Sequence, residues 1–151
     1  MAPTGAADRP LKLDDFLCFA VYSAGHAFNR VYKPLLDALG LTYPQYLAMV
    51  GLWAKDDQTV GELGARLALE SSTLTPLLKR LEGMGLITRR RDTKDERQVR
   101  VALTPAGAAL RRQAEAIPEC VMRATGMSED TLRRLLADVS TLRANLEAAA
   151  G

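Results

Sequence analysis

The sequence predicts a mainly α-helical protein with one small β-hairpin, built as a winged helix-turn-helix with dimerisation helices at its N- and C-terminal ends. Three observations predict this fold. Apolar residues recur at steps of three and four along most of the chain, and two short helical segments in the middle are joined by a tight turn. A charged stretch, residues 89–100, then lies between two short apolar runs and holds six basic residues against three acidic ones.

The length, composition and charge of the chain limit the classes of protein to which it can belong. The chain has 151 residues, 48% of them hydrophobic, and a net charge of only +2, so the overall charge says little about partners. No apolar run approaches the roughly 18 residues that span a bilayer, and residues 1–10 lack an apolar signal core. We therefore expect a cytoplasmic protein without membrane contact, with a disordered segment over residues 1–10.

Metal and cofactor binding find little support in the sequence. Cys18 and Cys120 are too far apart for a paired metal or redox motif, and His26 is the single histidine. We expect neither a metal nor a cofactor. In a reducing cytoplasm the two thiols are either inert small apolar residues or a regulatory pair.

The first helix is predicted from apolar periodicity over the N-terminal third of the chain. It is expected to start with Asp14 as its N-cap, to kink or restart at Pro34, and to stop at Gly40. Thr42 is expected to cap a second helix with Pro44 in its first turn. The segment after this helix, residues 55–58, is predicted to be a loop.

The helix-turn-helix is predicted from a capping signal and a leucine stripe. Thr59 and Glu62 have capping-box spacing, which predicts a short helix over residues 60–67. After a tight turn, Ser72 is expected to cap the next helix, residues 73–84. The buried stripe of this helix is Leu74, Leu77, Leu78 and Leu81, and its other face carries Thr73, Thr75, Lys79 and Arg80.

The charged stretch is predicted to be the turn of a hairpin with strands over residues 86–88 and 101–103. A solvated charged turn without a partner is the alternative. The preceding helix pair favours a wing, because a second helix can enter the major groove while a basic hairpin reaches the minor groove. Hydroxyls of Ser72, Thr73 and Thr75 would then contact bases or phosphates. The residues assigned to phosphates are Lys79, Arg80, Arg89, Arg90 and Arg91.

The C-terminal third predicts two more helices. One starts at Pro105, runs past Ile117, bends at Pro118 and stops at Gly126. Ser128 is expected to cap the last helix, whose apolar stripe is Leu132, Leu135, Leu136, Val139, Leu142 and Leu146.

The terminal helices, residues 11–40 and 105–150, carry more leucine than a winged region of residues 41–104 can bury. A homodimer is the simplest explanation, since two-fold dimers are the commonest oligomers. Such a dimer reads double-stranded DNA with a pseudo-palindromic operator, whose half-sites lie roughly 34 to 36 Å apart.

Three motifs resemble the MarR family of dimeric transcription regulators, and the resemblance covers residues 11–148. They are Leu86-Ile87-Thr88-Arg89, Asp95-Glu96-Arg97 and Val101-Ala102-Leu103-Thr104-Pro105-Ala106-Gly107. In that family an arginine of the wing enters the minor groove, and the aspartate two residues before it holds the arginine in place. The resemblance assigns these roles to Arg97 and Asp95.

Four further motifs resemble the organic hydroperoxide resistance regulators within that family. The resemblance implies that Cys18 reacts with the peroxide and that Tyr32 and Tyr43 hydrogen-bond to it, one of them from the facing subunit. In some members a late cysteine resolves the oxidised first one as a disulfide between subunits, and Cys120 holds that place. The motifs are Phe16-Leu17-Cys18-Phe19-Ala20, Tyr32-Lys33-Pro34-Leu35-Leu36, Leu41-Thr42-Tyr43-Pro44-Gln45-Tyr46 and Ser72-Thr73-Leu74-Thr75-Pro76.

The thiolate of Cys18 would need stabilising groups, because a free cysteine is mostly a thiol at neutral pH. Its neighbours in sequence, Asp14 and Asp15, are acidic and disfavour the thiolate. Tyrosine hydroxyls are therefore the candidates, with Tyr22 and Tyr46 as rival donors. Each tyrosine could equally be a core ring with its hydroxyl at the surface.

The resulting hypothesis is a repressor, not an enzyme, that is switched by an organic hydroperoxide. Oxidation of Cys18 to a sulfenic acid and then to a disulfide with Cys120 would move the dimerisation helices and release DNA. One alternative is a regulator of the same fold that responds to a small aromatic ligand. Another is a thiol peroxidase in which Cys18 turns over.

Overall fold

The computed structural model describes residues 11–151, and the predicted disorder of residues 1–10 lies outside the described residues. The chain divides into two compact units, one ending at Glu115 and the other formed by Ala116–Gly151. Among the described residues, no helix is long and apolar enough to cross a membrane.

The N-terminal helix begins later than predicted. Asp14 is not its N-cap but lies in a 3-10 turn, Leu13–Asp15. Helix α1 spans Leu17–Asp37, and its N-cap Phe16 is extended. The backbone N–H of Phe16 already bonds the carbonyl of Leu13, so the aspartate is used in the preceding turn rather than at the helix start.

Of the two signals predicted near the end of α1, Pro34 and Gly40, only Gly40 ends the helix. Pro34 lies inside α1, so it does not restart the helix. After the helix, the N–H of Leu41 bonds the carbonyl of Leu36, and Gly40 has φ of +70°. This positive φ favours glycine, which confirms Gly40 as the stop signal.

The predicted N-caps of the next two helices, Thr42 and Thr59, are both present, and each forms a capping box. Helix α2, Tyr43–Ala54, is capped by Thr42 together with Gln45, and Pro44 lies in its first turn. Helix α3, Val60–Leu67, is capped by Thr59 together with Glu62. The start of α3 is therefore fixed by local hydrogen bonds, as predicted.

The second helix of the helix-turn-helix starts slightly earlier than predicted. Helix α4 spans Ser71–Gly83, and its N-cap is Glu70 rather than Ser72. The N–H groups of Thr73 and Leu74 both bond the carbonyl of Glu70, which places Ser72 in the first turn. The predicted stripe of Leu74, Leu77, Leu78 and Leu81 is buried.

The hairpin is present, and its strands are longer than predicted. Strand β2 spans Ile87–Arg91, strand β3 spans Val99–Leu103, and the antiparallel register pairs Ile87 with Leu103 and Arg91 with Val99. A short strand, β1 (Gln58–Thr59), pairs with the other side of β3. The sequence predicted only a loop there, because two residues are too few to show a strand pattern.

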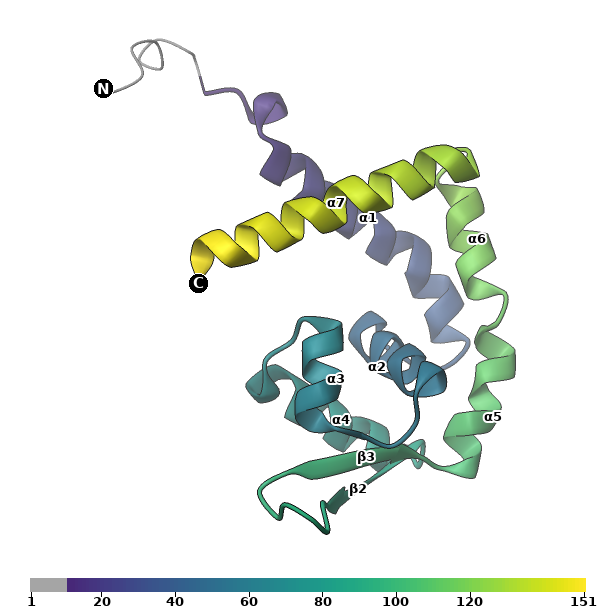
Figure 1. Ribbon diagram of the computed structural model, residues 1–151. Coiled ribbons are helices and arrows are strands. Elements are labelled where there is room, and N and C mark those ends of the chain that lie inside the picture. Colours follow the sequence, from purple (N-terminus) through teal and green to yellow (C-terminus); the bar gives the residue numbers. More distant parts are fainter. Residues whose placement is uncertain (1–10) are drawn as a thin grey trace. The chain divides into compact units, whose positions relative to one another are not determined.

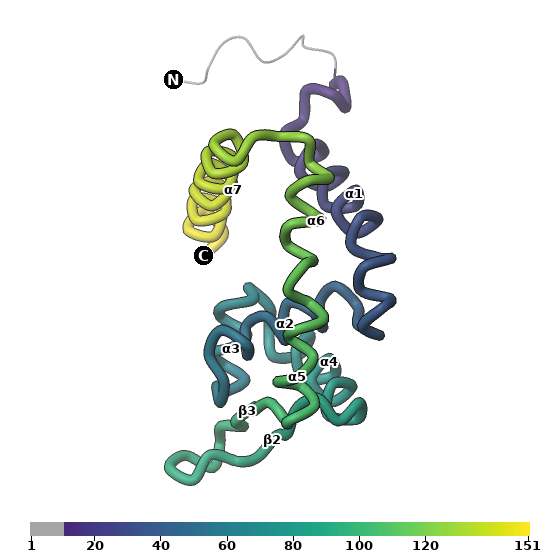
Figure 2. The backbone as a smooth tube through the Cα atoms, turned by 90° about the vertical axis from the view of Figure 1, so that its right-hand side faces the viewer, coloured from purple at the N-terminus to yellow at the C-terminus, as the bar shows by residue number. Residues whose placement is uncertain are grey.

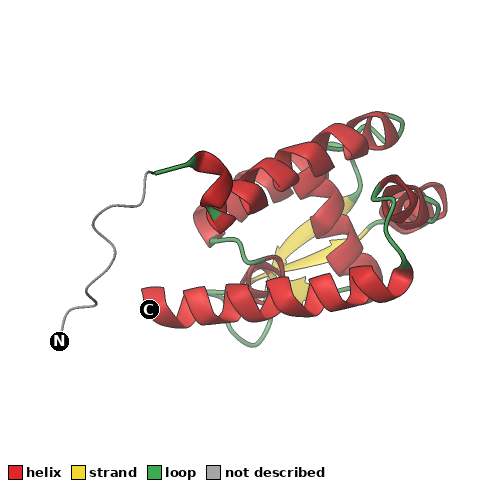
Figure 3. Ribbon diagram, turned by 90° about the horizontal axis from the view of Figure 1, so that it is seen from above, coloured by secondary structure: helices red, strands yellow, loops and turns green. Residues whose placement is uncertain are grey.

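The three strands form one small antiparallel sheet in the order β1-β3-β2 (Figure 3). Its inner face meets α2, α3 and α4 around the fully buried side chains of Leu52, Leu63, Leu78, Ile87 and Val101. The β2–β3 hairpin extends away from these helices in both Figure 1 and Figure 2. The core therefore anchors the base of the hairpin and leaves its tip in solvent.

The helix after the hairpin is broken where one bent helix was expected. Helix α5 spans Pro105–Ala114, and α6 spans Ile117–Ala124. Pro118 lies in the first turn of α6 and has no N–H, and its ring would clash with the carbonyl four residues earlier in a continuous helix. A new helix at this point avoids both problems.

The C-terminal unit holds α6 and α7 (Glu129–Ala150). Ser128 caps α7 by accepting a hydrogen bond from the N–H of Thr131, and Gly126 precedes it with φ of +64°. Both features were predicted. Among the described residues, none in α7 is buried, although Leu135, Leu136, Val139 and Leu146 form part of its apolar stripe.

Candidate DNA interface and cysteine site

The free face of α4 carries the side chains that the sequence assigned to DNA. Helix α4 follows α3 after a tight turn at Ala68, whose φ is +54°. Its leucine stripe points into the core, which turns the other face outward. The predicted contact residues on that face are all exposed: Ser72, Thr73, Thr75, Lys79 and Arg80.

The tip of the wing presents one arginine. The carboxylate of Asp95 accepts hydrogen bonds from Nε of Arg97 at 3.1 Å, from Nη2 at 3.4 Å and from the backbone N–H of Arg97 at 3.1 Å. The Arg97 side chain is nevertheless 91% exposed. The structure thus brings the two residues together, with a guanidinium that is held on one edge and open to solvent on the other.

The three consecutive arginines of β2 have different surroundings. Arg89 is mostly covered and is held by Glu82, with Nη2 at 3.1 Å from Oε1 and the backbone N–H at 3.0 Å from Oε2. These hydrogen bonds lower the pKa of Glu82. Arg90 pairs with Asp57 at 3.3 Å, and Arg91 donates from Nη1 to the carbonyl of Glu96 at 3.0 Å.

The phosphate roles of these arginines remain predictions. Arg90 and Arg91 are exposed, whereas the guanidinium of Arg89 already has a carboxylate partner between α4 and β2. The structure therefore gives Arg89 a bracing contact that the sequence did not suggest.

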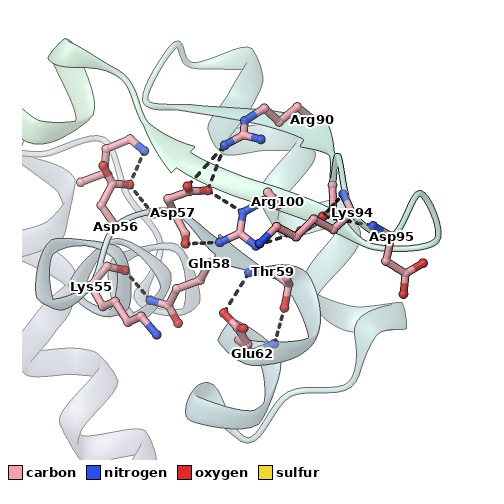
Figure 4. Close-up of polar contacts among 12 residues, drawn as sticks. Lys55, Asp56, Asp57, Gln58, Thr59, Glu62, Arg90, Lys94, Asp95 and Arg100 are labelled. Carbon is pink, nitrogen blue, oxygen red and sulfur yellow. Dashed lines mark hydrogen bonds and ion pairs between the residues drawn. The ribbon is translucent and has the colours of Figure 1, made fainter.

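Sequence reasoning missed the charged residues at the base of the wing. Asp56 accepts the N–H of Leu103 at 2.8 Å, so the loop after α2 is tied to β3. Asp57, with φ of +55°, faces Arg90 and Arg100 (Figure 4). Arg100 also donates a hydrogen bond to Asp92. Two adjacent aspartates before a capping box were a weak signal for this cluster, but their partners lie more than thirty residues away.

Cys18 lies in the first turn of α1 and is exposed. It shares a shallow apolar depression with Leu13, Phe16, Phe19 and Tyr22. Phe16, Phe19 and Tyr22 are themselves exposed large apolar side chains. The thiol is accordingly accessible on a face that favours apolar molecules or another apolar surface.

Three tyrosines form a separate cluster at the other end of α1. The ring of Tyr32 lies 4.7 Å from that of Tyr43 and 5.8 Å from that of Tyr46, between ring centroids. Burial, with the neighbouring rings of Tyr43 and Tyr46, raises the pKa of Tyr32 to about 12. Burial also raises the pKa of Tyr43. These hydroxyls remain protonated, and hence hydrogen-bond donors, throughout the physiological range.

Within one chain, the structure does not bring Tyr32 and Tyr43 to Cys18. Tyr32 lies fourteen residues further along the same helix, which corresponds to about 21 Å at about 1.5 Å per residue. Tyr43 packs on Tyr32 and is equally remote. Of the two rival donors, Tyr22 lies beside Cys18, whereas Tyr46 belongs to the remote cluster.

Cys120 is exposed on α6, in the C-terminal unit. The structure therefore describes the two thiols in separate units. Within residues 11–151, no cluster of three or more His, Cys, Asp or Glu side chains is placed to hold a metal ion.

Comparison with known proteins identifies the family of this chain. The chain matches the family described as transcriptional regulator SarA/Rot over residues 30–113. It is 49% identical to the HTH-type transcriptional regulator TtmR of Methylorubrum extorquens (strain PA1), over 100% of this chain and 77% of TtmR. It is 45% identical to the organic hydroperoxide resistance transcriptional regulator of Bacillus subtilis (strain 168), over 87% of this chain and 90% of that protein.

The chain is a MarR-family transcriptional regulator of the organic hydroperoxide resistance type. A solved structure of reduced AbfR bound to DNA matches it with a TM-score of 0.72 and 34% identity, over 89% of this chain and 93% of AbfR. The disulfide-formed AbfR matches with a TM-score of 0.59 and 34% identity, over 90% of each chain. The MarR-type chain is accordingly a DNA-binding protein with the predicted winged helix-turn-helix fold.

Proposed function

We propose that this MarR-type regulator is a homodimeric, cytoplasmic repressor that releases a pseudo-palindromic operator when an organic hydroperoxide oxidises Cys18. The observation that carries the proposal is the exposed thiol of Cys18 in an apolar depression on α1. A hydroperoxide with an alkyl or aryl group would bury apolar surface there, whereas hydrogen peroxide would gain nothing from it. The Bacillus subtilis relative, which is named for organic hydroperoxide resistance, supports this choice of oxidant.

The first chemical step is attack by the Cys18 thiolate on the outer oxygen of the hydroperoxide. An S–O bond forms as the O–O bond breaks, and the alkoxide leaves with a proton as an alcohol. The sulfur is oxidised to a sulfenic acid, and the peroxide is reduced. A sensor needs this reaction only once per chain, whereas a thiol peroxidase would repeat it through many turnovers.

The donors that stabilise this thiolate come from the second subunit in our proposal. Tyr32 and Tyr43 share a cluster about 21 Å from Cys18 along α1, so neither can reach the thiol of its own chain. An antiparallel approach of two α1 helices would place each cysteine beside the tyrosines of its partner. The resemblance implied one tyrosine from the facing subunit, and this geometry favours both.

The second step joins Cys18 to Cys120. The Cys120 thiolate attacks the sulfenic sulfur, the S–S bond forms, and hydroxide leaves and takes up a proton as water. The two Cα atoms must come within about 7 Å for this bond. Cys120 lies on α6, directly before α7, so the bond would pull on the helices that hold the dimer. The two recognition helices would then lose their half-site spacing.

Dimerisation itself is supported by the exposed apolar faces of the terminal helices. Only Leu36 is buried among the described residues of α1, although Leu17, Val21 and Phe28 are large and apolar. The stripe of α7 is likewise exposed. A second copy that covers these faces would bury the surface that the winged region leaves open.

On DNA, α4 would enter the major groove through Ser72, Thr73 and Thr75, and Arg97 would enter the minor groove with Asp95 as its support. Lys79, Arg80, Arg90 and Arg91 would bind phosphates, with Arg89 as a weaker candidate because Glu82 already holds it. These assignments rest on exposure and on the family pattern.

The proposal is tested by DNA release in single-cysteine variants. DNA from upstream of the protein's own gene is labelled, bound, and then treated with cumene hydroperoxide, hydrogen peroxide or neither. We expect Cys18→Ser to remain bound under all conditions, and Cys120→Ser to form a sulfenic acid without a linked dimer on non-reducing gels. Release of the Cys18→Ser protein by the hydroperoxide would contradict the proposal. Release by a small aromatic acid without oxidant would favour a ligand-responsive regulator.

The contribution of the second subunit is tested in mixed dimers. One chain carries Cys18→Ser, and the other keeps Cys18 but carries Tyr32→Phe with Tyr43→Phe. If the tyrosines act across the dimer, the mixed dimer retains one intact site and its sulfenic acid forms at the wild-type rate. If they act within one chain, no intact site remains, and the mixed dimer reacts as slowly as the tyrosine variant alone.

A further inference from the structure

A charged cluster links the base of the wing to the turn after α2. Arg100 on β3 donates from Nε to Oδ1 of Asp57 at 2.9 Å and from Nη2 to the backbone carbonyl of Asp57 at 2.8 Å. Its Nη1 donates to Oδ2 of Asp92 at 2.9 Å. Three of the five N–H groups of this guanidinium are therefore used inside the protein, and its side chain is only 25% exposed.

The second carboxylate in this cluster organises the tip of the wing. Oδ1 of Asp92 accepts the backbone N–H of Lys94 at 2.7 Å and that of Asp95 at 3.2 Å. Asp95 in turn holds Arg97. A continuous series of hydrogen bonds thus runs from Asp57 through Arg100, Asp92 and Asp95 to the arginine at the tip.

Apart from this series, one other side chain supports the tip: Nη1 of Arg91 donates to the carbonyl of Glu96 at 3.0 Å. Within residues 92–98, Asp92 is the only buried residue, and the other side chains are exposed or half-exposed. Two backbone hydrogen bonds close the turn, from the N–H of Asp92 to the carbonyl of Gln98 and from the N–H of Gln98 to the carbonyl of Asp95. A two-stranded hairpin without apolar packing is marginal in water, so polar contacts decide how well its tip is ordered.

We propose that Arg100 is a positioning residue for DNA recognition: it fixes Asp92, and through it the wing turn that presents Arg97. Arg100 does not contact DNA in this role. Its planar guanidinium group bonds Asp57 and Asp92 at the same time, which the single ammonium group of a lysine cannot do with the same geometry. The inference rests on the proposed role of Arg97 for its effect on DNA, but not for its effect on the free protein.

The free protein is tested by hydrogen exchange at the backbone amides of Lys94 and Asp95. In Arg100→Met we expect both amides to exchange about tenfold faster or more, because they lose the acceptor that Arg100 holds in place. In Arg100→Lys, the exchange rates of these two amides should lie between those of Arg100→Met and those of the wild type. The matched control is Arg90→Met, since Arg90 lies opposite Arg100 on β2 and also pairs with Asp57, but it does not bond Asp92. Unchanged exchange in Arg100→Met, with the amides of α2 and α3 as internal references, would overturn the proposal.

DNA binding is tested by a double-mutant cycle with Arg97→Ala, on the labelled upstream duplex described above. If Arg100 acts through the wing tip, Arg100→Met weakens binding about tenfold in the wild-type background but has little further effect in Arg97→Ala. Equal losses in both backgrounds would show that Arg100 acts on DNA binding independently of Arg97 and would overturn the proposal. If Arg97→Ala binds like the wild type, the wing assignment fails, and the exchange measurement alone decides the role of Arg100.

Discussion

The wing and the Cys18 end of α1 are built in opposite ways. At the wing, charged side chains find partners within the same chain: Asp57 and Asp92 hold Arg100, Glu82 holds Arg89, and Asp95 holds Arg97. Around Cys18 the neighbouring side chains are apolar and exposed, and the clustered tyrosines lie at the far end of the helix.

In our proposal, this difference separates reading DNA from sensing an oxidant. A single chain is sufficient to shape the surface proposed to contact DNA, because hydrogen bonds and the leucine core fix it locally. The proposed sensor needs a second chain, which covers the apolar face and supplies the tyrosine hydroxyls. Substitutions at the wing should consequently act within one chain, whereas substitutions around α1 and α7 should act through the dimer.

The largest expected effect is at Gly107, at the base of the wing. A Cβ atom there would lie 2.0 Å from the carbonyl oxygen of Leu86, a backbone atom that cannot easily move. We expect Gly107→Ala to lower the free energy of unfolding by about 3 kcal/mol or more, as measured by urea denaturation.

Gly25 on α1 is the matched control, because no described atom lies within 4 Å of a Cβ placed there. Gly25→Ala should raise stability by about 0.5 to 1 kcal/mol through helix propensity. A loss of stability that grows with protein concentration would instead show that a second chain approaches α1 closely at Gly25. Normal stability of Gly107→Ala would contradict the close packing of α5 against the backbone of Leu86.

The next effect concerns the apolar stripe of α7. Leu136 is 68% exposed, so Leu136→Asp should leave the fold of one chain intact but place a charge inside a dimer interface. We expect the dimer to weaken by about 2 kcal/mol or more, as measured by sedimentation equilibrium. Thr141→Asp introduces the same charge on the opposite side of the helix and should leave the dimer intact. Equal dissociation constants for both variants would argue against a dimer held by this stripe.

A smaller effect is expected at the tip of the wing. Arg97→Ala should weaken operator binding by roughly ten- to a hundredfold, because a groove contact is lost while the fold is unchanged. Arg91→Ala should instead reduce the slope of log affinity against log salt by about 0.9, as for one phosphate contact. Operator affinities measured by fluorescence anisotropy over a series of salt concentrations distinguish these two effects. A wild-type affinity for Arg97→Ala would show that the wing does not read the groove.

The smallest effect is a pH dependence in the tyrosine cluster. The pKa of Tyr32 is raised by burial to about 12 from an ordinary value of 10.0, so the folded chain keeps its proton where the unfolded chain loses it. This stabilisation is complete below pH 10 and is lost as the pH rises through 12.

Urea denaturation between pH 9 and 12 measures this effect, a range that brackets the ordinary tyrosine pKa of about 10. Stability should fall more steeply in the wild type than in Tyr32→Phe. Tyr22→Phe, on the exposed Cys18 end of α1, should behave as the wild type does. Identical slopes in all three proteins would contradict the burial of Tyr32.

The sequence alone determined the features that depend on neighbours a few residues apart. The helix caps at Thr42 and Thr59, the leucine stripe of α4, the stop at Gly40 and the position of the hairpin all follow from short-range hydrogen bonds and periodicity. The motifs around Cys18 and Asp95-Glu96-Arg97 also placed the chain in its family. Asp14 and Ser72 failed as caps because several nearby residues can satisfy the same first turn, and the local pattern does not rank them.

Only the tertiary structure decided the contacts between distant segments. Strand β1 exists because β3 pairs with it, and Arg100 gains its role because Asp57, forty-three residues earlier, turns toward it. The tyrosine cluster likewise forms only because α2 folds back against α1, which brings Tyr43 and Tyr46 to Tyr32. Such contacts depend on how the chain folds back on itself. Patterns of residue types at short spacing do not show which distant segments come together.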